Sequence, residues 1–121
     1  MACRDAGSLG DEAVTLLLDT HSFLWWLTDP ELLSTEASGA IGDPDNRVLV
    51  SITSLWEIAI KRVIGKLKAP IDLQNDVVRI GFELLPLSVV HIVSTESLPL
   101  FHRDPFDRML IAQLSRKVQL W

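Results

Sequence analysis

The spacing of apolar residues changes along the chain, and each spacing predicts a different element. Unbroken apolar runs at 15–19 (TLLLD) and 47–51 (RVLVS) predict buried strands of a parallel sheet. A shorter run at 83–88 (ELLPLS) predicts a third strand. Between and after these strands, apolar residues recur at helical spacing. The helices predicted in this way span residues 21–27, 31–41, 54–67, 71–82, 89–98 and 105–118.

The alternation of strands and helices predicts an α/β fold, in which a parallel sheet is covered by helices on both faces. In such sheets, ligands bind at the carboxyl ends of the strands, where the loops diverge. Residues 1–14 are mostly small and polar, and we expect them to form a frayed tail. Residues 15–121 are expected to form one domain, because their number suits a single core.

The composition narrows the class of protein. The chain is 48% hydrophobic and 22% charged, which is typical of a globular protein. Its one cysteine, Cys3, excludes a disulfide framework within the chain and fits a cytoplasmic location. No apolar run approaches the roughly 20 residues needed to span a bilayer, so we expect no membrane association. The first residues carry acids and no apolar core, so a secretory signal is not expected.

The formal net charge of −5 argues against a protein that grips a long stretch of nucleic acid, since such proteins are usually basic. It does not argue against a nuclease that uses metal ions. A cluster of acids that binds a metal contributes negative charge of its own.

Two acids near the predicted strand ends have plain structural explanations. Asp19 follows a buried strand and is suited to cap the next helix, with Thr20 as an alternative cap. Ser54 and Glu57 have the spacing of a capping box, in which the glutamate bonds back to the serine amide. Each explanation accounts for one acid at a time.

The last predicted helix opens with two further acids. Asp104 suits the N-cap, Pro105 the first helical position, and Asp107 the first turn, where the helix dipole favours negative charge. However, strand ends and the following helix starts share one edge of an α/β sheet. Asp19, Glu57 and the Asp104/Asp107 pair would therefore meet there and repel one another. The usual remedy is a hard divalent cation such as Mg²⁺ or Mn²⁺, which suits phosphoryl chemistry.

The histidines and aromatic residues add less. His21, His91 and His102 lack the spacing of a zinc site. Trp25 and Trp26 on the first helix are more simply explained by packing than by stacking on bases.

A basic run follows Glu57, and it has two interpretations. It is either a solvated helix face or a surface that holds a phosphate backbone beside the acids. The residues concerned are Lys61, Arg62, Lys66 and Lys68, together with Arg103 and Arg108 near the last pair of acids.

Three longer motifs carry a resemblance to a known family. LLLDTHSFLWWL (16–27), VSITSLWEIAIKRVIGKL (50–67) and LPLFHRDPFDRMLIAQ (98–113) occur in that order. They resemble the PIN-domain ribonucleases, and specifically the VapC toxins of bacterial toxin–antitoxin pairs. The similarity runs from about residue 15 to residue 114.

The resemblance implies a Rossmann-like α/β/α sandwich with a mostly parallel sheet, and RNA cleavage that depends on Mg²⁺ or Mn²⁺. It also implies a homodimer and a cognate VapB-type antitoxin that inserts into the active-site groove. Asp19, Glu57 and Asp107 match the family's catalytic, metal-binding acids. Asp104 matches the extra aspartate of the DPFD segment, which serves either the metal site or the structure of the helix start. The resemblance implies that Arg108 contacts either the substrate or a neighbouring acid. Lys61 and Arg103 are candidate substrate contacts from the basic run.

The resemblance also predicts what should follow the last motif. Such domains continue with a strand, a T-x-D segment that carries a fourth acid, and a closing element, whereas this chain reaches QLW at 119–121. We therefore expect the last strand and helix, and the fourth acid, to be missing. The alternative function is then a degenerate PIN domain that dimerises and binds an antitoxin with little or no catalysis.

Overall fold

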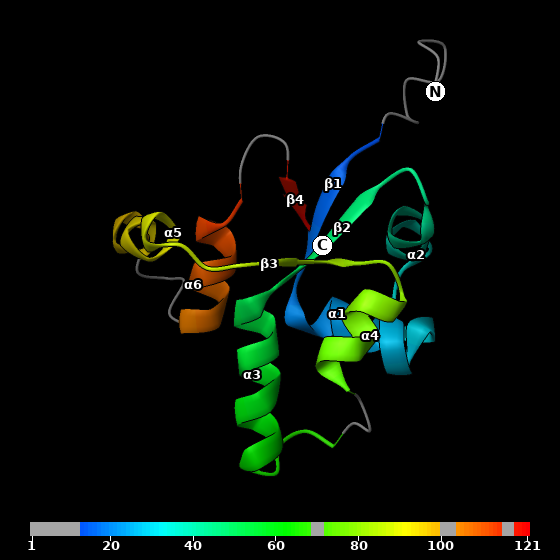
Figure 1. Ribbon diagram of the computed structural model, residues 1–121, viewed down its shortest axis with the longest axis horizontal. Helices are drawn as coiled ribbons and strands as arrows, with labels where there is room; N and C mark the ends of the chain where they lie inside the picture. Colours follow the sequence, from blue (N-terminus) through cyan, green and yellow to red (C-terminus); the bar gives the residue numbers. More distant parts are fainter. Residues whose placement is uncertain (1–12, 69–71, 100–103, 115–117) are drawn as a thin grey trace.

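A parallel sheet of four strands forms the centre of the molecule (Figure 1). The structure is a computed structural model that describes residues 13–68, 72–99, 104–114 and 118–121. The strand order is β3-β2-β1-β4, and every adjacent pair is parallel. The strands are β1 (Thr15–Leu18), β2 (Arg47–Ser51), β3 (Glu83–Leu85) and β4 (Val118–Leu120).

Helices connect the strands, and several of them end a few residues earlier than predicted. Six α-helices and two short 3₁₀ turns lie within the described residues. They are α1 (Thr20–Thr28), η2 (Pro30–Leu32), α2 (Thr35–Gly42), α3 (Ile52–Val63), α4 (Leu73–Arg79), α5 (Val89–Ser94), η3 (Thr95–Ser97) and α6 (Pro105–Ala112).

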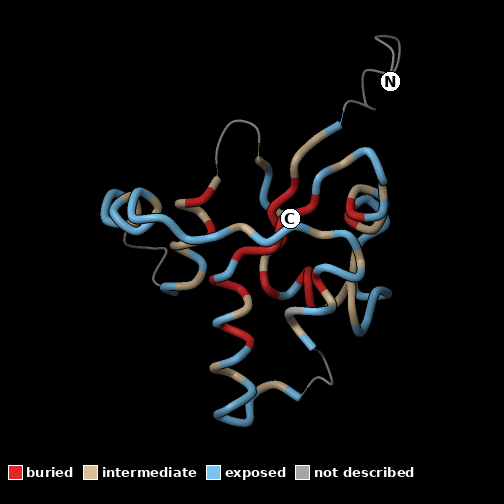
Figure 2. Tube along the Cα trace, in the orientation of Figure 1, coloured by how far each residue is buried: buried red, intermediate tan, exposed pale blue. Residues whose placement is uncertain are grey.

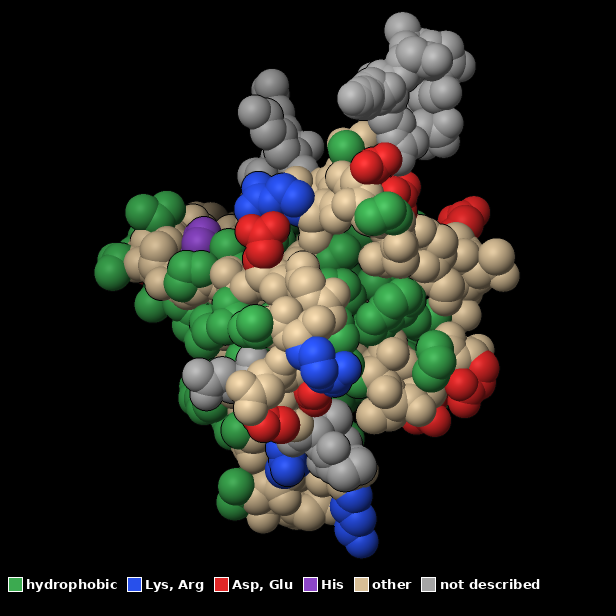
Figure 3. All heavy atoms as spheres, turned by 45° about the vertical axis from the view of Figure 1, so that its right-hand side comes forward, with side chains coloured by type: hydrophobic (Ala, Val, Ile, Leu, Met, Phe, Trp, Pro, Cys, Tyr) green, Lys and Arg blue, Asp and Glu red, His purple; other side chains and the backbone are tan. Residues whose placement is uncertain are grey.

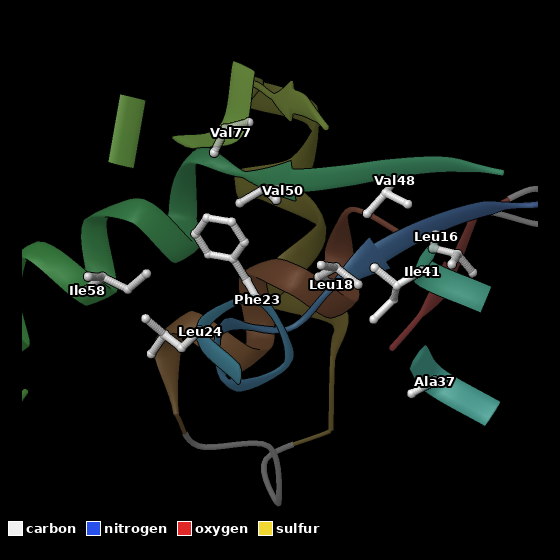
Figure 4. Close-up of a cluster of buried hydrophobic side chains, with 10 residues drawn as sticks. All are labelled: Leu16, Leu18, Phe23, Leu24, Ala37, Ile41, Val48, Val50, Ile58 and Val77. Atoms are coloured by element: carbon white, nitrogen blue, oxygen red, sulfur yellow. The ribbon is translucent and has the colours of Figure 1, made fainter. Parts of the chain in front are cut away.

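The alternation of side chains along β1 divides the core into two layers. Leu16 and Leu18 point to one face of the sheet, where α1, α2, α3 and α4 pack against them (Figure 4). Leu17 points to the other face, where Leu110 of α6 covers it. Because successive side chains of a strand alternate between faces, a fully apolar strand requires helices on both sides. The buried residues accordingly concentrate on β1, β2 and the helix faces turned toward them (Figure 2). The predicted α/β sandwich is confirmed.

One prediction about the sheet is wrong. The helical spacing predicted one helix over 105–118, and the family resemblance predicted that the last strand would be missing. Instead, α6 ends at Ala112, and residues 118–120 form β4, which pairs with β1 from Thr15↔Val118 to Leu17↔Leu120. Pairing with a distant strand decided the conformation of these residues, and local spacing does not report such pairing.

Two helix boundaries also differ from the prediction. The helix predicted at 31–41 is divided into η2 and α2, because Ser34 begins a new helix by accepting a bond from the Ala37 amide at 3.0 Å. The helix predicted at 54–67 begins earlier, at Ile52, and ends at Val63. The expected tail falls mostly on residues 1–12, which lie outside the described residues. None of the described helices is long and apolar enough to cross a membrane.

Candidate acidic site

Asp19 lies where β1 passes into α1. Its carboxylate Oδ1 accepts a hydrogen bond from the Ser22 amide at 2.7 Å, so the predicted capping role is confirmed. Its backbone amide donates to the Trp121 carbonyl oxygen at 2.7 Å. A capping bond and a bond to the β4 side of the sheet therefore fix Asp19 at the carboxyl edge of the central strand.

Glu57 is buried, with 4% of its surface exposed. The predicted capping box with Ser54 is wrong: Ser51 is the N-cap of α3 and accepts a bond from the Thr53 amide at 3.0 Å. Glu57 thus lies in the second turn, where no free amide is available to it. Its Oε1 instead accepts a bond from the Thr20 hydroxyl at 2.6 Å, and its Oε2 pairs with the Lys61 ammonium at 2.6 Å.

Two buried hydroxyl groups complete the surroundings of Glu57. The Thr20 and Ser54 oxygens are 3.1 Å apart, and both residues are buried beside the carboxylate. Sequence reasoning treated both residues only as helix caps. A signal was available for Ser54, because residues three apart on a helix share a face and Ser54 precedes Glu57 by one turn. Thr20 could not be found in this way, since α1 and α3 are brought together only by the fold.

Asp104 and Asp107, at the start of α6, have different surroundings. Asp104 Oδ1 accepts bonds from the amides of Phe106 at 2.8 Å and Asp107 at 3.4 Å, so its predicted capping role is confirmed. The Asp107 carboxylate lines a cavity of about 260 Å³ together with Asp19 and Leu120. The structure therefore brings Asp107, from the far end of the chain, to the acid that ends β1.

The charges of the acids act on one another. Burial raises the pKa of Asp107, and the negative charges of Asp104, Glu57 and Asp19 raise it further, while His21 lowers it. The pKa of Lys61 is raised by its bond to Glu57, and the charges of Glu57, Asp104 and Asp107 also raise it, against the opposing effect of burial. All four predicted acids thus belong to one electrostatic cluster, with Lys61 as a counter-charge.

The donor atoms of this cluster suit a hard divalent cation, because they are carboxylate oxygens. Within the described ranges, however, no three Asp, Glu, His or Cys side chains lie close enough to enclose a metal ion. Repulsion between the acids and the engagement of Glu57 by Thr20 and Lys61 account for this open arrangement.

The basic residues predicted to contact substrate have different positions. Lys61 pairs with Glu57 inside the acidic cluster. The Arg108 guanidinium donates to the backbone carbonyls of Pro99 at 2.9 Å, of Leu98 at 3.3 Å, and of Thr95. It therefore ties the end of η3 to α6. Arg103 lies outside the described residues. Substrate contact by these three residues stays a prediction.

Comparisons with known proteins agree with this architecture. The family model described as PIN domain matches residues 16–116. Ribonuclease VapC22 of Mycobacterium tuberculosis is 28% identical over 101 residues, which cover 81% of this chain and 77% of that protein. The matched region contains β1, β2, α3 and the α6 acids, the elements that carry the cluster. The chain therefore belongs to the PIN domain family.

Proposed function

We propose that this protein is a metal-dependent endoribonuclease, the toxin of a VapBC-type toxin–antitoxin module. The observation that carries the proposal is the convergence of Asp19, Glu57 and Asp107 from three separate segments at the carboxyl edge of the sheet. A relative named as a ribonuclease supports the substrate class.

In this proposal, Asp19 and Asp107, which line one cavity, would hold a Mg²⁺ or Mn²⁺ ion, with Glu57 as the third acid and Asp104 as an additional one. When bound, the ion lowers the pKa of a water molecule and neutralises charge on the phosphate. The protein's own residues pre-orient the acids. Thr20 and Lys61 hold the two oxygens of Glu57, and the Ser22 amide holds Asp19.

The proposal includes a homodimer. The side chains of α5 leave an apolar surface in contact with solvent: Val89 is 75% exposed, Val90 72% and Val93 55%. Figure 3 shows hydrophobic side chains on the side of the molecule where α5 lies. Contiguous exposed apolar surface of this kind is typical of a protein–protein interface. The second proposed partner is a VapB-type antitoxin.

The proposal is tested by incubating the purified protein with labelled RNA in Mg²⁺, Mn²⁺ or EDTA. We expect cleavage with either ion and none with EDTA. Asp19→Asn should reduce the rate by at least about 100-fold, because it removes a metal-binding charge. Asp45→Asn, in the exposed loop between α2 and β2, is the matched control and should retain the wild-type rate. Equal loss in both variants, or cleavage in EDTA, would contradict the proposal.

A second candidate is an antitoxin-binding module without catalysis. The open arrangement of the acids in the described residues, and the neutralisation of Glu57 by Lys61, favour it. Tight antitoxin binding with no cleavage of any RNA at saturating Mg²⁺ or Mn²⁺ would establish this candidate over the first.

A further inference from the structure

A second cavity opens beside the acidic cluster, between α1 and the end of α3. Its volume is about 470 Å³, which is within the range of small-molecule sites. Thr20 and Lys61 line this cleft and also bond to Glu57. The cleft therefore borders the acidic cluster at the two residues that bond to Glu57.

One wall of the cleft is aromatic. His21 and Trp25 lie one turn apart on α1, and their ring centroids are 5.9 Å apart with an interplanar angle of 47°. Trp26, the next residue, packs instead against Phe82 at the core. The two tryptophans therefore differ in role. Trp26 is explained by packing, whereas Trp25 presents part of its ring to a cavity beside the acids.

The opposite wall is basic, and a turn after α3 builds it. Gly65 has a φ of +77°, a conformation that favours glycine, and it reverses the chain. The amides of Lys66 and Leu67 then donate to the Lys61 carbonyl at 2.8 and 3.2 Å. These bonds place Lys66 and Lys68 along the cleft.

These two lysines are available to a ligand. Lys66 and Lys68 are exposed, and neither side chain has a hydrogen bond or ion pair with another described residue. Lys61, by contrast, is already paired with Glu57. Figure 3 shows Lys and Arg side chains at the end of the molecule where α3 finishes, with Asp and Glu side chains next to them. Asp29 also lines the cleft, at the end of α1. Because its negative charge repels phosphate, phosphate groups are favoured on the side of the cleft that carries the lysines.

We propose that this cleft binds one unpaired nucleotide of the RNA, adjacent to the phosphate that is cut. His21 and Trp25 contact the base, and Lys66 and Lys68 contact the neighbouring phosphates. Stacking on aromatic side chains requires a base that is free of its own partners, so the cleft selects single-stranded RNA. The inference rests on the proposed ribonuclease function and adds the residues that hold a nucleotide beside the cut phosphate.

The test measures binding of a fluorescent single-stranded decaribonucleotide by anisotropy, in an Asp107→Asn background with Mg²⁺ so that cleavage does not interfere. Lys66→Gln/Lys68→Gln should weaken binding about tenfold or more. It should also make the plot of log K against the logarithm of salt concentration less steep, by about 1.4, since each phosphate contact on a single strand contributes about 0.7. Trp25→Leu and His21→Ala should each weaken binding at least about fivefold with little change in salt slope.

Two control variants show whether a loss of binding comes from the cleft itself or from removing charge or a tryptophan anywhere on the surface. Arg47→Gln/Arg79→Gln removes the same charge from two exposed ion pairs that do not line the cleft. Trp56→Leu removes a tryptophan that is 59% exposed and lies in a different cavity. Both controls should bind the oligonucleotide like the parent protein. The exposed His21→Ala tests the aromatic wall even if Trp25→Leu is unstable.

The outcomes distinguish this inference from the function on which it rests. If the otherwise wild-type protein cuts RNA but the cleft variants bind and cut as well as it does, the inference is overturned and the ribonuclease function stands. If the protein neither binds nor cuts any RNA, both are overturned. Equal binding of duplex RNA, or a loss confined to antitoxin binding, would also overturn the inference.

Discussion

Glu57 is an acid with almost no solvent contact, and its neighbours hold its side chain in position. A buried carboxylate is costly unless it is paired and hydrogen-bonded. Thr20 supplies the hydrogen bond and Lys61 the charge. Each oxygen thus has its own partner, and the side chain is held toward the cluster by two helices.

Thr20→Val tests this support. The substitution keeps the shape of the side chain but removes the donor to Glu57 Oε1. We expect the free energy of unfolding to fall by about 1–3 kcal/mol, the usual cost of leaving a buried polar group without its partner. RNA cleavage should fall as well. Urea denaturation and a cleavage assay measure both effects. Thr20→Ser, which retains the hydroxyl, should recover most of each, and wild-type stability in Thr20→Val would contradict the assignment.

Asp107 gives a prediction about pH. Its pKa is raised in the folded protein, so its charged form opposes folding, and this penalty applies above the raised pKa. Asp107→Asn should therefore raise the melting temperature at neutral pH. The gain should disappear as the pH falls toward the ordinary aspartate pKa of about 3.9, where the wild-type side chain is protonated too. Thermal melts across pH without divalent ions measure this. A variant less stable than wild type at pH 7 would contradict it.

At the scale of elements, the start of α6 shows how one short segment serves two purposes. Asp104 caps the helix through its side chain, which fixes the first turn. That turn carries Asp107 to the cavity beside Asp19. Capping, one of the two explanations of this pair, therefore applies to Asp104, and metal binding by Asp107 stays a proposal.

Asp104 variants separate the two explanations. Asp104→Ala should cost about 1 kcal/mol of unfolding free energy, because Ala cannot accept the amide bonds of the first turn. Asp104→Asn should keep nearly wild-type stability, since Asn is an equally good N-cap. Calorimetric titration with Mn²⁺ then decides whether Asp104 also binds metal. Wild-type Mn²⁺ affinity in Asp104→Asn would restrict Asp104 to capping, and weakened affinity would add the second role.

Features that depend on neighbouring residues could be predicted from the sequence, whereas features that depend on contacts between distant parts of the chain could not. The apolar runs of β1 and β2 and the acid at the end of β1 follow from local pattern, and the structure agrees. The start of α3 was misjudged because Ser51 and Ser54 are both good caps, and the choice depends on where β2 ends. The partners of Glu57 and the strand β4 depend on residues far away in the chain, which local spacing does not contain.

At the scale of the whole molecule, the apolar surface of α5 and the acidic cluster lie on different elements, so association and catalysis can be tested separately. Val89→Lys/Val93→Lys places two charges on the proposed dimer surface, and we expect a shift from dimer to monomer in sedimentation velocity. Val63→Lys/Val78→Lys alters valines that are 87% and 70% exposed on α3 and α4 and is the control. A control that dissociates equally, or a wild type that is monomeric at all concentrations, would contradict the assignment.

The pairing of β4 with β1 has a consequence for when Asp19 becomes fixed in place during synthesis. The Asp19 amide bonds to Trp121, and the Trp121 amide bonds to Leu17, so the first strand obtains its last partner from residues made nearly a whole chain later. Contacts between such distant segments form late in folding. A nascent chain on the ribosome therefore carries Asp19 without its final anchor until residues 118–121 have emerged.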